Sequence, residues 1–571
     1  MTQRTAPLPA SSSERRNGRS IALLLFPLVA LLATLPLILN GSSCGHDFDF
    51  HVVSWMEAAT QFRQGNLHPH WAFTAAFNAG EPRFVFYPPL SWTIGALLGL
   101  LLPWTAAPIV YTWLVLTAAG LACYRLLRSF TAPRTALFVA AIYAVNPYML
   151  FTAYERTAYA ELLAAVWLPL LLHAILRERV HALGIAIPVA LLWLTNPPAA
   201  VLGCYSLAFL TAARLTLTLL KPQGATISPA QLARSSIFGA ALGLGLASFY
   251  LVPAAFERRD VDVAMASAQS MLIGDNFLFH HTSDPDHDAV LRTASFLALG
   301  LLLATGVSLL IGFYRSSSKG SGRGILYVLA ALAATIALLL TSASAPVWHH
   351  APVLAFLQFP WRFLAMLTPA LALSLAFALR DTHLTPARAA SASLLLAGVF
   401  TLAGYRAFAQ SCDPQETVAG QLSLFRAHRG SDATDEYTPN GASNENLSNH
   451  TPPFWLAPDP GAPAPATAQA GPLRWPVDIT SPVPQTLILN LRNYSAWRIT
   501  LNHQLITIRL GRDDGLIAIP IPAGLSRLDI AYARSEDQIV GQAISAAALV
   551  IFLIVRRRHR PLSRPPSSVR A

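Results

Sequence analysis

Cys44-Gly-His-Asp-Phe-Asp-Phe-His51 places two carboxylates and two histidines just beyond the first apolar run of the chain, residues 21–39. Carboxylates at the edge of a bilayer lose hydration, so acids in such a position indicate a functional site. Asp47 also stands where it would cap the helix that follows, because an acid at a helix N-terminus accepts hydrogen bonds from unpaired N–H groups. Capping does not account for Asp49, and both interpretations of Asp47 stay open.

The composition predicts an integral membrane protein. Of the 571 residues, 54% are hydrophobic and 12% are charged, whereas soluble proteins average about 25% charged residues. The formal net charge of +11 would suggest a nucleic-acid partner in a soluble chain. Here much of the basic excess lies in short loops between apolar runs and at the C-terminus, which is the positive-inside pattern of membrane proteins and argues against nucleic acid.

Apolar runs that are candidates for membrane spans occupy residues 21–39, 87–102, 107–127, 135–150, 162–176, 183–195, 199–219, 236–255, 293–313, 325–341, 363–379, 389–408 and 540–555. If 87–102 crosses the membrane, most arginine-bearing loops fall outside; if it does not, they fall inside, as the positive-inside rule requires. We therefore expect 87–102, which begins with Pro88-Pro89, to be a re-entrant or surface-lying helix. About twelve spans remain.

This topology divides the chain into segments with different environments. We expect a cytoplasmic N-terminus (1–20), a transmembrane domain (21–409) with a first outer loop (41–104), a Pro/Ala-rich outer linker (410–472), a β-rich outer domain (473–538), a last transmembrane helix (540–555) and a basic cytoplasmic tail (556–571). Alternating segments such as Trp497-Arg-Ile-Thr-Leu501 predict a small β-sandwich. The loops are elaborate on the outer face of the inner membrane, so we expect the chemistry there.

Cysteine and histidine positions leave further alternatives. Cys44 and Cys412 would both face the outer compartment, where they could pair as a disulfide. Cys123 and Cys204 lie within spans and are most simply packing residues. The run 280–288 contains three histidines and three aspartates, which could bind a metal ion or be solvated in a loop.

Two further segments at the outer ends of spans carry charge. Residues 154–161 read Tyr-Glu-Arg-Thr-Ala-Tyr-Ala-Glu, and residues 358–363 read Gln-Phe-Pro-Trp-Arg-Phe. An arginine such as Arg362, at the membrane edge among aromatic residues, needs an anion. That anion would be one of the nearby acids, in a structural ion pair, or a phosphate held bidentately by the guanidinium, and both readings remain open.

Taken together, these features resemble the GT-C superfamily of membrane glycosyltransferases. The shared features are an acid after the first span, a first outer loop ending in Tyr87-Pro-Pro-Leu90, a second outer loop with Pro-Tyr, Arg and Glu, and a late Phe359-Pro-Trp-Arg-Phe363. More narrowly, the chain resembles bacterial membrane proteins labelled "6-pyruvoyl-tetrahydropterin synthase-related", and its C-terminal part is similar to YfhO-type proteins. The resemblance covers about 21–555 and implies a polytopic α-helical, GT-C-like fold with a C-terminal β-sandwich-like domain.

The resemblance also implies a function in the cell envelope. The enzyme would transfer a sugar from a polyprenyl phosphate or diphosphate carrier, with Asp47 or Asp49 as catalytic base and Arg362 as the contact to the donor phosphate. Base catalysis and positive charge on the departing phosphate are what sugar transfer requires. Supporting acids, or ligands of a divalent cation such as Mg²⁺ or Mn²⁺, would be Glu155 and Glu161. Residues that would line the site are His46, His51, Tyr87, Arg156 and Trp361.

The sequence departs from one branch of the superfamily and leaves other functions open. The Trp-Trp-Asp motif of oligosaccharyltransferases is absent, and the second-loop acids do not form Asp-x-Glu, so a peptide acceptor is not indicated and the dependence on a divalent cation stays open. A transporter or flippase of lipid-linked saccharides would need charged residues deep in its spans and broken helices. A non-catalytic scaffold for envelope assembly is the third alternative. Nearly uncharged span centres favour the enzyme.

Overall fold

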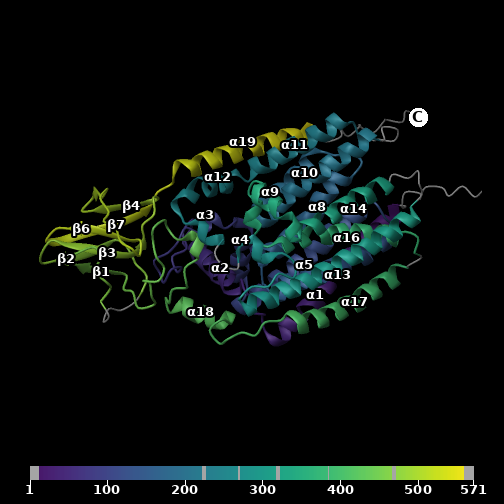
Figure 1. The fold of residues 1–571 in the computed structure, drawn as a ribbon. Helices are drawn as coiled ribbons and strands as arrows, with labels where there is room; N and C mark the ends of the chain where they lie inside the picture. Colours follow the sequence, from purple (N-terminus) through teal and green to yellow (C-terminus); the bar gives the residue numbers. More distant parts are fainter. Residues whose placement is uncertain are drawn as a thin grey trace, which may run out of the picture.

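The computed structural model describes residues 12–220, 227–267, 271–316, 322–382, 385–465 and 471–558. A long body of helices carries a strand-rich domain at one end (Figure 1). Much of the expected N-terminal segment (1–11) and of the expected basic tail (559–571) lies outside the described residues.

Within the described ranges, ten helical segments are long and apolar enough to cross a membrane. They are formed by α1 (Ser12–Asn40), α5 (Ala107–Leu127), α6 (Pro133–Ala144) with α7 (Pro147–Tyr154), α8 (Tyr159–Leu176), α10 (Pro197–Leu220), α13 (Pro285–Arg315), α14 (Gly322–Leu339), α16 (Leu364–Ala378), α17 (Pro386–Phe408) and α19 (Glu536–Arg558). An eleventh results if α11 (Pro229–Leu246) and α12 (Ser248–Glu257), which meet at 74°, form one broken span. The chain is a multi-pass helical membrane protein.

The expected number of about twelve spans also includes one helix that is too short to be counted by length. Residues 183–195 form α9 (Ala182–Trp193), which has 12 residues and is about 18 Å long at 1.5 Å per residue. The hydrocarbon core of a bilayer is about 30 Å thick. Helix α4 (Pro89–Leu101) has 13 residues and is likewise shorter than a full span, in agreement with the re-entrant or surface-lying helix predicted at 87–102.

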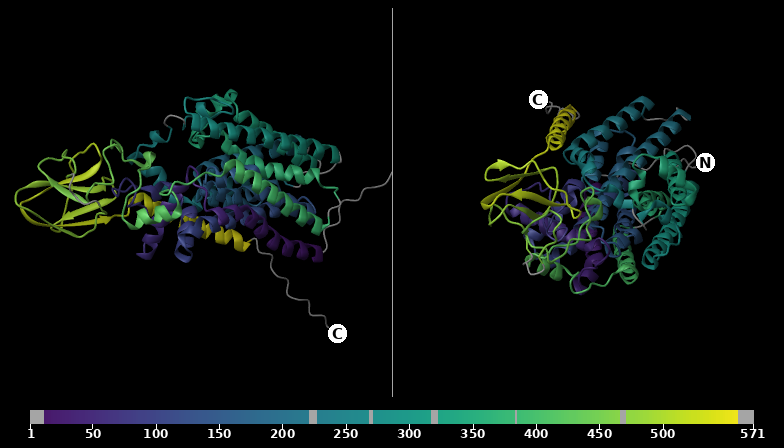
Figure 2. Two further views of the ribbon diagram at one scale, coloured as in Figure 1. Left: turned by 90° about the horizontal axis from the view of Figure 1, so that it is seen from below. Right: turned by 60° about the vertical axis from the view of Figure 1, so that its left-hand side comes forward.

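The C-terminal strands of the described chain form two antiparallel sheets, ordered β1-β3-β6 and β2-β7-β4-β5. The strands are β1 (Phe454–Ala457), β2 (Val477–Ser481), β3 (Gln485–Arg492), β4 (Trp497–Leu501), β5 (Gln504–Leu505), β6 (Leu516–Ile521) and β7 (Gly524–Tyr532). Leu487 and Ile519 of the first sheet share a core with Ile499 and Ile530 of the second. This packing is the β-sandwich that the alternating sequence predicts (Figure 2).

The stretch 410–472 is more structured than a linker. It contains α18 (Val418–Arg426), and β1 begins at Phe454, well before residue 473. Trp455 of β1 pairs with Ile488 of β3, so the β-domain takes its first strand from this stretch. The composition of 410–472 is rich in Pro and Ala, but order here comes from pairing with distant residues, which local composition does not report.

The first outer loop connects the helical body to the β-domain. It contains α2 (Phe48–Arg63), α3 (Arg83–Phe86) and α4. Between α2 and α3, the Trp71 ring packs against Trp497 with ring centroids 5.2 Å apart, and the carbonyl of Ala79 accepts a hydrogen bond from Arg492 N at 2.9 Å. Helices α2, α3 and α18 consequently lie at the same end of the body as the β-domain (Figure 1).

Candidate active site

Asp47 connects the first outer loop to the second. It occupies the N-cap position of α2, but its side chain accepts no capping hydrogen bond, so the capping interpretation is wrong. Its backbone N–H donates to the carbonyl of Arg156 at 3.0 Å, and its carboxylate lies 3.5 Å from Arg156 Nη2. Gly45 permits this approach, because a Cβ at that position would collide with the carbonyl oxygen of Glu155.

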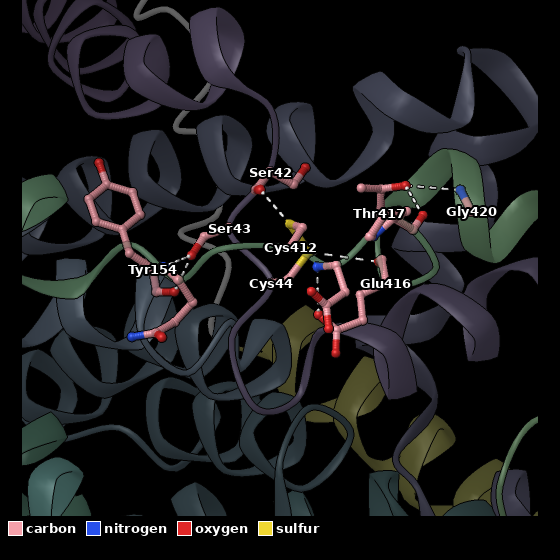
Figure 3. Close-up of a disulfide and its surroundings, with 11 residues drawn as sticks. Ser42, Ser43, Cys44, Tyr154, Cys412, Glu416, Thr417 and Gly420 are labelled. Carbon is pink, nitrogen blue, oxygen red and sulfur yellow. Dashed lines mark hydrogen bonds between the residues drawn. A yellow bond between two sulfur atoms is a disulfide. The ribbon is translucent and has the colours of Figure 1, made fainter. Parts of the chain in front are cut away.

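A disulfide between Cys44 and Cys412 fixes the same place, across 368 residues of sequence (Figure 3). Beside it, Ser43 Oγ donates to the carbonyl of Tyr154 at 2.6 Å and accepts from Gln410 N at 2.8 Å. Three segments therefore meet next to Asp47: the chain after α1, the second outer loop and the chain after α17. The two cysteines that we expected to pack within spans are not in disulfides.

Glu161, in the first turn of α8, bridges two arginines. Its Oε2 lies 2.5 Å from Arg156 Nη1 and 3.5 Å from Arg362 Nε. Its Oε1 accepts a hydrogen bond from the Tyr148 hydroxyl at 2.6 Å. Asp47 lies on the other side of Arg156, so two carboxylates and two guanidiniums alternate in a row. Arg362 thus has the acidic partner that the sequence allowed, and Arg156 is at the centre of the cluster.

The charge state of Arg156 follows from these neighbours. Burial alone would lower the pKa of Arg156, but the carboxylates of Glu161 and Asp47 raise the pKa above its ordinary value. Its guanidinium therefore stays positively charged although the residue is only 5% exposed.

Aromatic rings hold both guanidiniums from one side. The rings of Phe359 and Trp361 stack with centroids 5.1 Å apart. The guanidinium carbon of Arg156 lies 4.9 Å from the Trp361 centroid, and that of Arg362 lies 4.8 Å from the Phe359 centroid. These are cation–π distances. The Phe-Pro-Trp-Arg-Phe motif therefore contributes its rings as well as its arginine.

His51 lies one turn of α2 beyond Asp47, among the rings of Tyr87 and Tyr159, at centroid distances of 5.8 and 5.4 Å. It is 2% exposed, and its Nδ1 has no hydrogen-bond partner in the part of the chain that the structure describes. Burial lowers the pKa of His51 to about 4, so its imidazole is neutral at pH 7. Asp49, in contrast, is exposed, and its carboxylate accepts a hydrogen bond from Phe50 N at 2.7 Å.

These side chains meet in one open cavity of about 1480 Å³. Eight of the ten residues that the sequence singled out line it: His46, Asp47, Asp49, His51, Tyr87, Arg156, Trp361 and Arg362. Glu155 and Glu161 are not among the described residues of its wall. Glu161 is held by the arginines, and Glu155 interacts with the side chain of Gln410, while burial raises the pKa of Glu155.

Two parts of the cavity wall were not predicted from the sequence. Arg83 is 3% exposed and donates to Glu81 Oε1 at 2.7 Å, to Ser54 Oγ at 3.0 Å and to Thr434 Oγ1 at 3.3 Å. An acid and a base, Glu81 and Arg83, stand two residues apart in the first outer loop. This pair is the signal in the sequence that could have identified Arg83 as a candidate. The second part is 429–437, nine consecutive residues that all line the cavity. We call this segment the strap.

The described residues provide only part of a binding site for the predicted divalent cation. Among the described residues, no three His, Cys, Asp or Glu side chains form a group that could hold a metal ion. In the run 280–288, Asp284 caps α13 through the N–H groups of Asp286 and His287. A Mg²⁺ or Mn²⁺ ion would need Asp47 or Asp49 together with water and ligand phosphate oxygens, which is how Mg²⁺ is often bound. The cation stays a prediction.

Comparisons with known proteins give little beyond this geometry. No family model matches the chain, and no curated protein matches it. Among solved structures it is similar to the arabinofuranosyltransferase AftD from mycobacteria, determined by single-particle cryo-EM, with 16% sequence identity and a TM-score of 0.40. The match covers 73% of this chain and 28% of that one. A likeness at this level assigns no activity, and the narrower resemblances to the 6-pyruvoyl-tetrahydropterin synthase-related and YfhO-type proteins stay predictions.

Proposed function

We propose that the protein is a membrane glycosyltransferase that moves a sugar from a polyprenyl phosphate or diphosphate carrier to an acceptor at the outer face of the membrane. The observation that carries this proposal is the cavity that Asp47 and Asp49 line together with Arg156 and Arg362. Sugar transfer needs a base for the incoming hydroxyl and positive charge on the departing phosphate, in a site shielded from bulk water. This wall supplies both kinds of group.

The contacts suggest different tasks for the two aspartates. Asp47 is paired with Arg156 at 3.5 Å and would keep that guanidinium in place. Asp49 has an exposed carboxylate on the same helix turn and lines the same cavity, so it is the better placed of the two to take the proton of an acceptor hydroxyl. Arg362 and Arg156 would contact the donor phosphate, and planar guanidiniums suit that ligand.

An apolar part of the wall is suited to the carrier lipid. It is formed by the end of α9, the beginning of α10, Leu291 of α13 and the chain before η8 (Pro360–Phe363), whereas Asp286 and His287 at the beginning of α13 are polar. Its residues include Trp193, Pro197, Val201, Leu291 and Phe356. A hydrocarbon chain can leave the phosphate along such a surface and stay out of water.

The positions of the basic residues support an outer-face cavity. Helices α8, α13 and α16 have their N-termini near the cavity and end near Arg177, Arg315 and Arg380 at the opposite end of the body. Lys and Arg are enriched in cytoplasmic loops. We therefore propose that those helix ends, like the two chain termini, lie in the cytoplasm of an inner-membrane protein, and that the cavity and the β-domain lie outside.

Transfer from radiolabelled polyprenyl-phosphate sugars to membrane acceptors tests the proposal. Membranes would contain wild type, Asp47→Asn, Asp49→Asn or Arg362→Ala, with Asp478→Asn, an exposed position in β2, as the matched control. We expect Asp49→Asn and Arg362→Ala to lose at least about 100-fold in rate at normal protein abundance, as the removal of a general base or of a group that stabilises developing charge commonly does. Unchanged transfer in all three site variants would contradict the site.

One observation favours the second candidate, a transporter or flippase of lipid-linked saccharides. The 74° bend between α11 and α12 is a broken helix of the kind found in transporters. Vesicles that hold the protein and a fluorescent polyprenyl-phosphate sugar distinguish the two functions. Movement of the lipid between leaflets, with no sugar transferred by wild type, would replace the enzyme by the transporter.

A further inference from the structure

The cavity is larger than one ligand requires. Pockets for small ligands commonly measure about 300–1,000 Å³, and this cavity measures about 1480 Å³. The arginine cluster and the apolar wall account for one part of its lining. The strap, 429–437, forms another part, and its chemistry differs from both.

The first outer loop fixes the backbone of the strap. Ser431 N donates to the carbonyl of Thr74 at 2.8 Å, and Phe77 N donates to the carbonyl of Ser431 at 2.9 Å. Thr434 N donates to Glu81 Oε2 at 2.8 Å. Because the backbone is held in this way, the side chains of Asp432, Thr434, Asp435 and Glu436 form a fixed polar surface in the cavity wall.

This surface is acidic, whereas guanidiniums and carboxylates alternate at the phosphate end. The strap contains three acids and one arginine, Arg429. Arg83, which lies behind Thr434, is neutralised by Glu81 at 2.7 Å. Burial and the neighbouring acids Glu81 and Asp435 raise the pKa of Glu436. A raised pKa favours the neutral acid of Glu436, so the repulsion of anions by this surface rests on Asp432 and Asp435, and all three side chains can hydrogen-bond to hydroxyl groups.

A buried polar atom lies between the two ends of the cavity. Nδ1 of His51 has no hydrogen-bond partner among the described residues, although the ring is 2% exposed and lines the cavity. Ser54, one turn further along α2, is held by Arg83, so α2 runs from the phosphate cluster toward the strap. A ligand hydroxyl that reaches His51 from the strap side would satisfy this atom.

We propose that the strap and His51 form the acceptor subsite, and that the acceptor is an uncharged oligosaccharide. The carboxylates of the strap would accept hydrogen bonds from sugar hydroxyls, and an acceptor with carboxylate or phosphate groups would be excluded by charge. This inference rests on the proposed function, because it assigns the second substrate of the same transfer.

Binding of defined sugars to the full-length protein in lipid nanodiscs tests the subsite. The probes are neutral trisaccharides of hexoses and of pentoses and, as the anionic counterpart, trigalacturonate, each followed by saturation-transfer NMR. We expect wild type to bind at least one neutral trisaccharide at least fivefold more tightly than trigalacturonate. The double variant Asp435→Asn/Glu436→Gln should lose that preference. Glu445→Gln, an exposed position outside the cavity wall, is the control and should retain it.

Two results would overturn the subsite: no binding of any neutral trisaccharide, or an unchanged preference in the double variant. Binding of a polyprenyl phosphate to the same samples separates this inference from the proposed function. The strap variant should bind that lipid as wild type does, and Arg362→Ala should not. If Arg362→Ala bound polyprenyl phosphate as well as wild type does, while sugar binding still depended on the strap, the donor site would be refuted and the acceptor subsite retained.

Discussion

Replacing Glu161 with glutamine would leave Arg156 and Arg362 without the carboxylate that they share. Both guanidiniums lie within 3.5 Å of its Oε2. Glutamine has the same shape, but if its oxygen accepts from the Tyr148 hydroxyl, its NH2 group faces the two guanidiniums, so the change removes both the charge and the acceptor that the arginines share. At an effective dielectric constant of about 20, two unit charges about 4 Å apart interact by about 4 kcal/mol. Breaking a buried ion pair from one side costs about 3–5 kcal/mol, and we expect a loss of stability in that range.

The same change should strengthen anion binding. Glu161 now occupies the positive potential that a ligand phosphate would use, so its removal should tighten binding of inorganic pyrophosphate by roughly tenfold, which corresponds to about 1.4 kcal/mol. Pyrophosphate should then restore part of the lost stability, because a ligand that binds only the folded state stabilises it.

Thermal unfolding in detergent, with and without pyrophosphate, measures both effects. Glu155→Gln is the matched control, since this buried neighbour interacts with Gln410 and not with either arginine. The reasoning would be refuted if Glu161→Gln were as stable as wild type, or if pyrophosphate stabilised the two proteins equally. Equal stabilisation would show that Glu161 does not compete with an anion.

Three further changes test the architecture around the cavity. Replacing Cys44 and Cys412 by serine should cost about 2–5 kcal/mol, and thermal unfolding that equals wild type would contradict a structural disulfide. Gly45→Ala should cost about 1–3 kcal/mol by overpacking against the second outer loop, whereas Gly274→Ala, where a Cβ meets open space, should be neutral in the same assay. Because the pKa of His51 is about 4 in the folded protein and 6.5 otherwise, unfolded chains bind more protons between these values. The free energy of unfolding should therefore not depend on His51 above pH 6.5 and should fall by up to ~3 kcal/mol toward pH 4. Unfolding measured at several pH values should show a smaller pH dependence in His51→Gln than in wild type. An equal pH dependence in the two proteins would contradict the role of His51.

Much of the fold was predictable because hydrophobic length is a strong signal. The positive-inside pattern separated the short helix α4 from true spans, although its length alone was ambiguous in the sequence. The apolar run 183–195 forms α9, which is shorter than a full span, although it leads from the end of α8 back to the cavity wall at Trp193. The alternation of β4 and β7 was clear, since alternate residues of each strand are buried in the sandwich core.

The sequence predicted most residues of the candidate site but not which charged side chains pair with one another. Asp47, Arg156 and Arg362 stand out because charge is rare at span ends. Whether Arg362 meets an acid or a phosphate depends on how α8 and α16 pack, and a single sequence does not report that. The role of Glu161 changed most: it was expected to be a supporting acid, and in the structure it is the residue that neutralises and positions both arginines.

The strap was missed for a different physical reason. Its sequence has no periodicity, and its neighbours are rich in Pro, Ala and Ser, which is typical of linkers. Its order comes from hydrogen bonds to residues 74–81, more than 350 positions earlier, and from the disulfide that ties Cys412 to Cys44. The order of the strap therefore depends on its contacts with the first outer loop, which local sequence does not report. The wall that we assign to the acceptor would consequently depend on the same loop that carries Asp47 and Asp49.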